Sequence, residues 1–147
     1  MGKKIICLDF DGVIHSYISG WLEPDFIPDP PVPGALAFIK SVLESTEYDL
    51  KIYSSRSSQV GGIRAMQVWL KHWLIKEYGW PDGAGLGNQL MKSYTYPTGT
   101  TQLITRYNYF PTEKPSAFIT IDDRALTFQG TFPTFAEINN FKPWNKK

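Results

Sequence analysis

The chain has 147 residues, 42% of them hydrophobic and 20% charged, which is typical of one soluble globular domain. Its formal net charge of +1 gives no electrostatic reason to expect a nucleic acid or a membrane surface as the main partner. The only cysteine, Cys7, excludes a disulfide within the chain. The apolar run around Cys7 is too short for a signal peptide or a membrane span, so we expect a cytoplasmic protein that does not bind membranes.

The first predicted strand is the continuous apolar run Ile5–Leu8, which is typical of a strand covered on both faces. Residues 16–33 hold five of the eleven prolines and predict a loop without regular structure, because proline removes backbone donors. A helix is predicted from Pro33 onwards, since apolar residues recur there on one helical face. These residues are Leu36, Ile39, Val42 and Leu43.

A second strand and a second helix follow in the middle of the chain. Residues 50–53 form the next apolar run, and residues 62–78 carry a helical pattern that Gly79 is well placed to cap. The large side chains on one side of this helix are expected in the core rather than in a ligand site. They are Ile63, Met66, Leu70, Trp73 and Leu74.

The region after this helix is rich in glycine and in turn-forming residues. The run Gly83–Gly87 does not follow a strand and lacks the spacing of a nucleotide-binding motif, so it is interpreted as a flexible surface loop. Two further strands are predicted at 103–109 and 117–121. The alternation predicts one α/β domain over residues 1–147, a Rossmann-like parallel sheet with helices on both faces and a loop-rich insertion at 79–113.

Acidic, hydroxyl and basic side chains follow three of the predicted strands. They are Asp9 and Asp11 after the first strand, Ser54 and Arg56 after the second, and Asp122 and Asp123 after the last. In open parallel sheets, ligands bind beyond the carboxyl ends of the strands. Carboxylates held close together are costly unless a cation or a phosphoryl group compensates their charge, and Mg²⁺ prefers oxygen ligands. The sequence therefore predicts a magnesium site at this edge of the sheet.

The order of these motifs resembles that of the haloacid dehalogenase (HAD) superfamily. Its first motif, Asp-x-Asp-x-(Thr or Val), matches Asp9–Val13, and its second, a Ser or Thr that ends an apolar strand, matches Ser54. Its third motif, a lysine shortly before the last catalytic strand, matches Lys114, and its fourth, an acidic pair, matches Asp122–Asp123. The Ile-Asp-Asp-Arg form of the fourth motif resembles small deoxyribonucleotidases and polynucleotide 3′-phosphatase domains.

The resemblance implies a HAD-type phosphatase that hydrolyses phosphomonoesters through an aspartyl-phosphate. Asp9 would attack phosphorus, and Asp11 would protonate the leaving oxygen and then activate water. Ser54 would donate a hydrogen bond to the phosphoryl group, and Lys114 would offset its negative charge. Ser55 remains an alternative to Ser54.

The resemblance also implies Mg²⁺ as the cofactor. An oxygen of Asp9, the backbone carbonyl of Asp11 and an acid of the fourth motif would bind the ion, with Asp123 preferred over Asp122 as the direct ligand. Lys92 remains an alternative to Lys114. Further candidate contacts to the phosphate are Gly12, His15, Ser55 and Arg56.

Residues 16–33 are too few for a helical cap, since two helices of average length already exceed them. We therefore expect a nearly capless, open site bordered by this loop as a flap, with Tyr17 and Trp21 at its entrance. The expected substrate is a nucleotide or another small phosphomonoester. The alternatives are a phosphatase acting on a polynucleotide end or a phosphoprotein, and a non-catalytic binding protein with the same fold.

Overall fold

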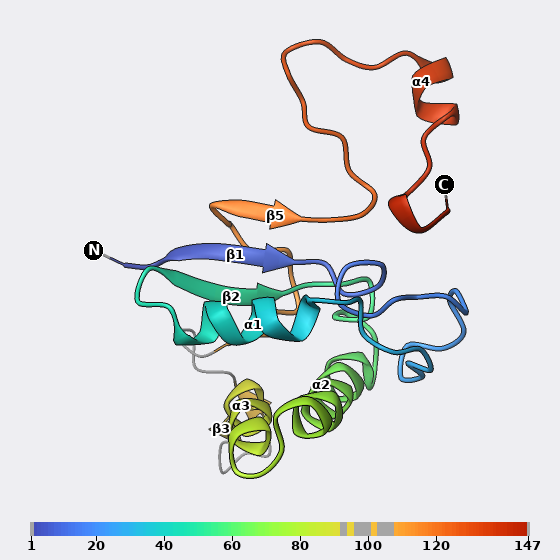
Figure 1. Ribbon diagram of the computed structural model, residues 1–147. Coiled ribbons are helices and arrows are strands. Elements are labelled where there is room, and N and C mark those ends of the chain that lie inside the picture. The colour runs from blue at the N-terminus through green and yellow to red at the C-terminus, as the bar shows by residue number, and fades with distance from the viewer. Residues whose placement is uncertain (1, 92–93, 96–100, 103–107, 147) are drawn as a thin grey trace.

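The computed structural model describes residues 2–91, 94–95, 101–102 and 108–146. Its main sheet has three parallel strands in the order β2-β1-β5 (Figure 1). They are β1 (Lys4–Leu8), β2 (Tyr48–Ile52) and β5 (Ile119–Ile121), and a separate antiparallel ladder joins β3 (Tyr94–Thr95) to β4 (Thr101–Gln102). The predicted α/β class with a parallel sheet is confirmed.

Three helices accompany the sheet, and two shorter ones follow it. They are α1 (Ala35–Glu44), α2 (Gly62–Tyr78), α3 (Asp82–Leu90), α4 (Phe135–Asn139) and the 3₁₀ helix η2 (Trp144–Lys146). The predicted bounds of α2 are confirmed, and the Gly79 N–H caps it by donating to the Ile75 carbonyl. Helix α1 begins later than the predicted Pro33, because Gly34 has a left-handed φ of 87° that no right-handed helix accommodates.

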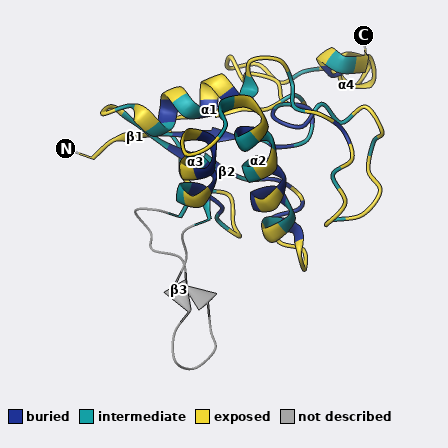
Figure 2. Cartoon of the chain, turned by 60° about the horizontal axis from the view of Figure 1, so that its bottom comes forward, coloured by how far each residue is buried: buried dark blue, intermediate teal, exposed yellow. Residues whose placement is uncertain are grey.

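The core lies where the helices meet the central strand. Ile6, Cys7 and Leu8 are all buried although consecutive side chains of a strand point to opposite faces, so both faces of β1 are covered. Along α1 and α2, buried positions alternate with exposed ones at helical spacing (Figure 2). Strand β5 differs, because all three of its residues are exposed.

The run Gly83–Gly87 corrects the prediction of a flexible loop, because it forms most of α3. A Cβ atom added to Gly83 would lie 2.1 Å from the Leu74 carbonyl oxygen, and one added to Gly87 would lie 2.5 Å from Lys71 Cγ. These glycines therefore let α3 pack closely on α2. The tertiary contact outweighs the low helix propensity of glycine, about 1 kcal/mol per residue relative to alanine.

Two other strand predictions have different outcomes. Residues 103–107 of the predicted strand at 103–109 lie outside the described residues. At its end, the Tyr109 carbonyl accepts from the Ile52 N–H (2.7 Å). Strand β5 is shorter than the predicted 117–121, although the Phe118 N–H still donates to the Ile5 carbonyl (2.9 Å). Among the described residues, no helix is both long enough and apolar enough to cross a membrane.

Residues 124–146, here called the C-terminal arm, leave the end of β5, run away from the sheet and return towards it (Figure 1). Most of their side chains are exposed. The arm is fixed where it returns, because Trp144 Nε1 donates to the Gly12 carbonyl (2.7 Å) and Asn145 Nδ2 donates to the Ser16 carbonyl (3.4 Å). The last helix is therefore anchored to the loop that follows β1.

Candidate active site

The carboxyl ends of the three strands lie side by side, as the parallel order requires. Leu8 is in register with both Ile52 and Ile121, and the backbone pairing continues one residue further, where the Asp9 N–H donates to the Ile121 carbonyl (2.9 Å). A cavity of about 200 Å³ opens at this edge. It is lined by Cys7, Asp9, Tyr53, Ser54, Ser55, Lys114, Thr120 and Asp122. The fold thus brings the predicted nucleophile, hydroxyls and lysine to one place.

Asp9, Asp122 and Asp123, here called the acidic cluster, each present an oxygen within 4.8 Å of the others. Both carboxylate oxygens of Asp123 are buried, and neither accepts a hydrogen bond from the described part of the chain. Asp122 is exposed and accepts from the Arg124 N–H (2.8 Å), while Arg124 Nε lies 3.8 Å from Asp123 Oδ2. Buried acceptors without donors are costly, and three carboxylates suit a hard cation.

The acidic cluster changes the protonation of Asp9. Burial, the close Asp123 carboxylate and the charge of Asp122 together raise the pKa of Asp9 from 3.8 to about 8. The Phe10 N–H opposes this shift, because it donates to Asp9 Oδ1 (2.8 Å) and favours the charged form. Without a cation, Asp9 therefore holds a proton at neutral pH, and a cation favours its ionised, nucleophilic form.

Gly12 makes room for the most buried member of the acidic cluster. Its φ is 85°, and a Cβ atom at this position would lie 2.2 Å from Asp123 Oδ2. The structure thus places Gly12, predicted as a phosphate contact, directly against the Asp123 carboxylate. Glycine is required here both by the left-handed backbone and by the close approach.

Asp11 lies on the other side of the turn and is held by two side chains. Arg56 donates to it twice, from Nε to Oδ2 (2.9 Å) and from Nη2 to Oδ1 (3.1 Å). His15 Nδ1 lies 2.8 Å from Asp11 Oδ1, and the Asp29 N–H donates to His15 Nε2 (3.1 Å). Because Nε2 accepts, the neutral imidazole carries its proton on Nδ1 and donates it to Asp11.

His15 and Arg56 were predicted to contact phosphate, and the structure places both elsewhere. Their side chains are 0% exposed. Arg56 Nη1 donates to three backbone carbonyls of the proline-rich loop (residues 16–33), and the Trp21 ring centroid lies 4.8 Å from Arg56 Cζ. The three carbonyls belong to Glu23 (2.8 Å), Pro24 (2.9 Å) and Phe26 (3.2 Å). The polar atoms of both side chains are engaged in contacts with Asp11 and with the loop.

The proline-rich loop lacks helices and longer strands, as predicted, but it is fixed rather than free to act as a flap. Its two ends are tied by the Ser16 N–H to the Pro30 carbonyl and by the Val32 N–H to the Ile14 carbonyl. In between, the Asp29 carboxylate accepts from Ser19, and the Asp29 carbonyl accepts from Trp69 Nε1 (3.2 Å). Desolvation opposes ionisation of Asp29, but the hydrogen bonds from Ser19 prevail and lower its pKa.

Sequence reasoning missed the structural roles of Asp29, Trp69 and Trp144. Trp69 and Trp144 contact residues 40 and 132 positions away in the chain, so no local spacing could reveal them. Lys114 lies at the cavity, whereas its alternative Lys92 lies outside the described residues. Burial raises the pKa of the Cys7 thiol, which agrees with its interpretation as a buried strand residue rather than a nucleophile.

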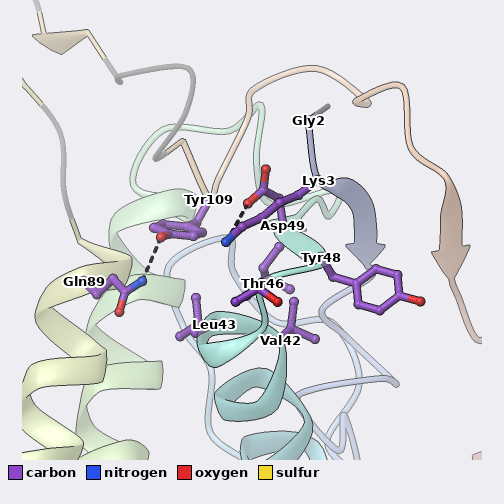
Figure 3. Close-up of a pocket in the computed structure, with 10 residues that line it drawn as sticks. Gly2, Lys3, Val42, Leu43, Thr46, Tyr48, Asp49, Gln89 and Tyr109 are labelled. Carbon is purple, nitrogen blue, oxygen red and sulfur yellow. Dashed lines mark hydrogen bonds and ion pairs between the residues drawn. The ribbon is translucent and has the colours of Figure 1, made fainter.

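A larger pocket of about 540 Å³ lies at the opposite edge of the sheet (Figure 3). Four of its lining side chains form two pairs: Lys3 Nζ lies 3.9 Å from Asp49 Oδ1, and Gln89 Nε2 donates to the Tyr109 hydroxyl (2.9 Å). None of the predicted site residues lines this pocket. The acidic strand ends therefore remain the candidate active site.

No protein-family model, curated protein or solved structure matched the chain. The class that fold and site define is thus an α/β protein with a cluster of carboxylates at the carboxyl edge of a parallel sheet. Any closer assignment rests on the chemistry of that edge.

Proposed function

We propose that this protein is a magnesium-dependent, HAD-type phosphatase that hydrolyses a nucleotide or another small phosphomonoester. The observation that carries the proposal is the acidic cluster, whose member Asp123 has two buried oxygens without a donor in the described part of the chain. Ser54 and Lys114 line the same cavity as Asp9. Carboxylates that suit a cation thus adjoin groups that suit a phosphoryl oxygen.

Magnesium fits the donors that the site offers. The acidic cluster would hold the ion together with the backbone carbonyl of Asp11, as the resemblance to HAD enzymes implies. When bound, Mg²⁺ supplies positive charge that stabilises the phosphoryl oxygens as negative charge develops on them. A strong requirement for the ion also follows from the raised pKa of Asp9, because the carboxylate is the nucleophilic form.

The chain's own residues would divide the reaction into two steps. An Asp9 oxygen attacks phosphorus while the bond from phosphorus to the leaving oxygen breaks, which gives an aspartyl-phosphate. Water then attacks that phosphorus, releases inorganic phosphate and restores Asp9. Asp11 is the proposed proton donor and later the base. Both oxygens of Asp11 are engaged by Arg56 and His15, so proton transfer requires substrate to replace one of these contacts.

The test is a panel of phosphomonoesters assayed for released phosphate with Mg²⁺ and with EDTA. We expect turnover that EDTA abolishes and that Asp9→Asn removes, since an amide is a poor nucleophile. Asp82→Asn is the matched control, because Asp82 is exposed on α3 away from the cavity. Turnover by purified Asp9→Asn at the wild-type rate would exclude the covalent mechanism.

Polynucleotide 3′-phosphates and phosphopeptides belong in the same panel, because their hydrolysis uses the same chemistry. A non-catalytic binding protein predicts instead that Mg²⁺ and a phosphate ester bind without release of phosphate. Calorimetric binding beside the turnover assay therefore separates an enzyme from a binding protein.

A further inference from the structure

We infer that Arg56 is a positioning residue that holds Asp11 and the proline-rich loop together as one fixed unit. The inference about Asp11 rests on the proposed function, whereas the inference about the loop concerns the fold alone. Under this inference, Arg56 binds other parts of the chain rather than phosphate, and the loop does not act as a flap.

All three nitrogens of the Arg56 guanidinium donate to other parts of the chain. Nε and Nη2 donate to the two oxygens of Asp11, and Nη1 donates to the three loop carbonyls. The Trp21 ring covers the guanidinium at 4.8 Å from Cζ. A fully buried arginine is tolerated only when its donors are paired in this way. The Arg56 guanidinium therefore links Asp11 to the proline-rich loop.

The loop depends on this arginine because apolar burial does not hold its middle part. Trp21, Leu22 and Phe26 are 41%, 47% and 51% exposed. The carbonyls around them nevertheless converge on one side chain, Arg56 Nη1. Removing that donor takes one partner from all three carbonyls and leaves that of Glu23 only the Phe26 N–H (3.2 Å), so we expect residues 21–26 to detach while the ends of the loop stay tied.

A lysine cannot reproduce the arrangement. Its single ammonium nitrogen lacks the planar fork that reaches both oxygens of a carboxylate and a separate set of carbonyls. Arg56→Lys therefore keeps the charge and tests the geometry. Arg56→Ala leaves a space that a free guanidinium ion can fill, which tests the contact without a covalent side chain. Arg64→Ala is the matched control, because Arg64 is an exposed arginine on α2 with no described contact to the loop.

The first readout is cleavage by chymotrypsin, for which Trp21, Leu22 and Phe26 are suitable sites. We expect faster cleavage in the loop for Arg56→Ala and Arg56→Lys but not for Arg64→Ala. The second readout is steady-state turnover of the best phosphomonoester. A misplaced Asp11 should lower kcat about 10²-fold with a smaller change in KM, as expected when a group that acts in the transition state is displaced.

Rescue separates positioning from general damage. Millimolar guanidinium should restore loop protection and kcat to Arg56→Ala and should leave Arg56→Lys unchanged. Wild-type kcat and wild-type loop protection in Arg56→Ala would overturn the inference while the proposed function stands. If the wild type hydrolyses no phosphomonoester, the proposed function fails, and loop protection with its rescue still decides the role of Arg56 in the fold. If Arg56→Ala does not fold, Arg56→Lys decides, and wild-type protection in that variant would refute the inference.

Discussion

Gly12 belongs to the first acidic motif and lies directly against Asp123, which belongs to the last one. Gly12→Ala would place a methyl group 2.2 Å from Asp123 Oδ2 and put a side chain on a backbone with a φ of 85°. We expect the Asp123 carboxylate to be displaced and Mg²⁺ affinity to fall at least tenfold, about 1.4 kcal/mol. Isothermal titration with Mg²⁺ measures this loss.

Gly20→Ala is the control for the Gly12 variant. Gly20 has a similar φ of 73°, but a Cβ atom there would meet nothing within 4 Å. In both variants, an alanine in the left-handed backbone conformation costs about 1–2 kcal/mol. Only Gly12→Ala also brings a methyl group into contact with Asp123. Equal Mg²⁺ affinity of the two variants would show that the contact with Asp123 does not matter.

The raised pKa of Asp9 couples proton release to metal binding. The pKa is about 8 in the folded, metal-free protein and 3.8 in the ordinary reference state. Protonated Asp9 therefore contributes stability that is complete below the reference value and is lost as pH rises through about 8. We expect metal-free protein to become less stable over this range, and Mg²⁺ to raise the melting temperature more at the alkaline end.

Calorimetry in buffers of different ionisation enthalpy should detect the proton that Mg²⁺ displaces at neutral pH. Asp9→Asn removes the titrating carboxyl and keeps the shape of the side chain. The stability of this metal-free variant should therefore depend less on pH between 3.8 and about 8 than that of the wild type. Proton release of wild-type size from Asp9→Asn would assign the displaced proton to another group.

At the scale of elements, the α2–α3 pair depends on glycines that a helix would otherwise avoid. Gly83→Ala and Gly87→Ala should destabilise the protein by about 1–3 kcal/mol, because the added methyl groups overpack the contact with α2. Gly85→Ala is the control within the same helix, since its Cβ would meet nothing within 4 Å. That variant should be up to about 1 kcal/mol more stable than wild type.

Urea unfolding of the three alanine variants measures these differences. Opposite signs for Gly85 and for the other two glycines are the distinguishing result. Uniform stabilisation would mean that α3 is a helix whose glycines have no packing role.

The anchor of the C-terminal arm is a second contact between distant elements. Trp144→Phe removes the N–H that donates to the Gly12 carbonyl and keeps an aromatic ring. We expect a loss of about 1 kcal/mol in stability and weaker Mg²⁺ binding, because the Gly12 turn also packs on Asp123. Trp80→Phe is the control, as Trp80 is 73% exposed. Thermal unfolding with and without Mg²⁺ makes the comparison.

At the scale of the whole molecule, the sequence predicted those elements whose apolar residues form a continuous run or recur at a regular spacing. The run Ile5–Leu8 and the pattern over 62–78 identified β1 and α2, and the strand ends identified the acidic cluster. Helix α3 was missed because its glycines form a helix only against α2. The glycine-rich composition indicated a loop there, and the tertiary contact with α2 decides for a helix.

Arg56 was predicted to contact phosphate, and in the structure its guanidinium donates to Asp11 and to the proline-rich loop. Its position two residues after Ser54 indicated the site, and a guanidinium is a common phosphate ligand. Its burial depends on the return of Glu23, Pro24 and Phe26, which are about thirty residues away along the chain. No sequence spacing specifies how a proline-rich loop turns back, so its contacts with Arg56 could not be predicted.

The anchoring of Trp144 on Gly12 has a consequence for the order in which the protein is made. Asp9 leaves the ribosome before the acids Asp122 and Asp123 and before the Trp144 anchor. A nascent chain that stops before β5 carries Asp9 without the carboxylates that would bind a cation beside it. The acidic cluster is therefore completed only after β5 has been synthesised, and the cation site proposed there cannot form earlier.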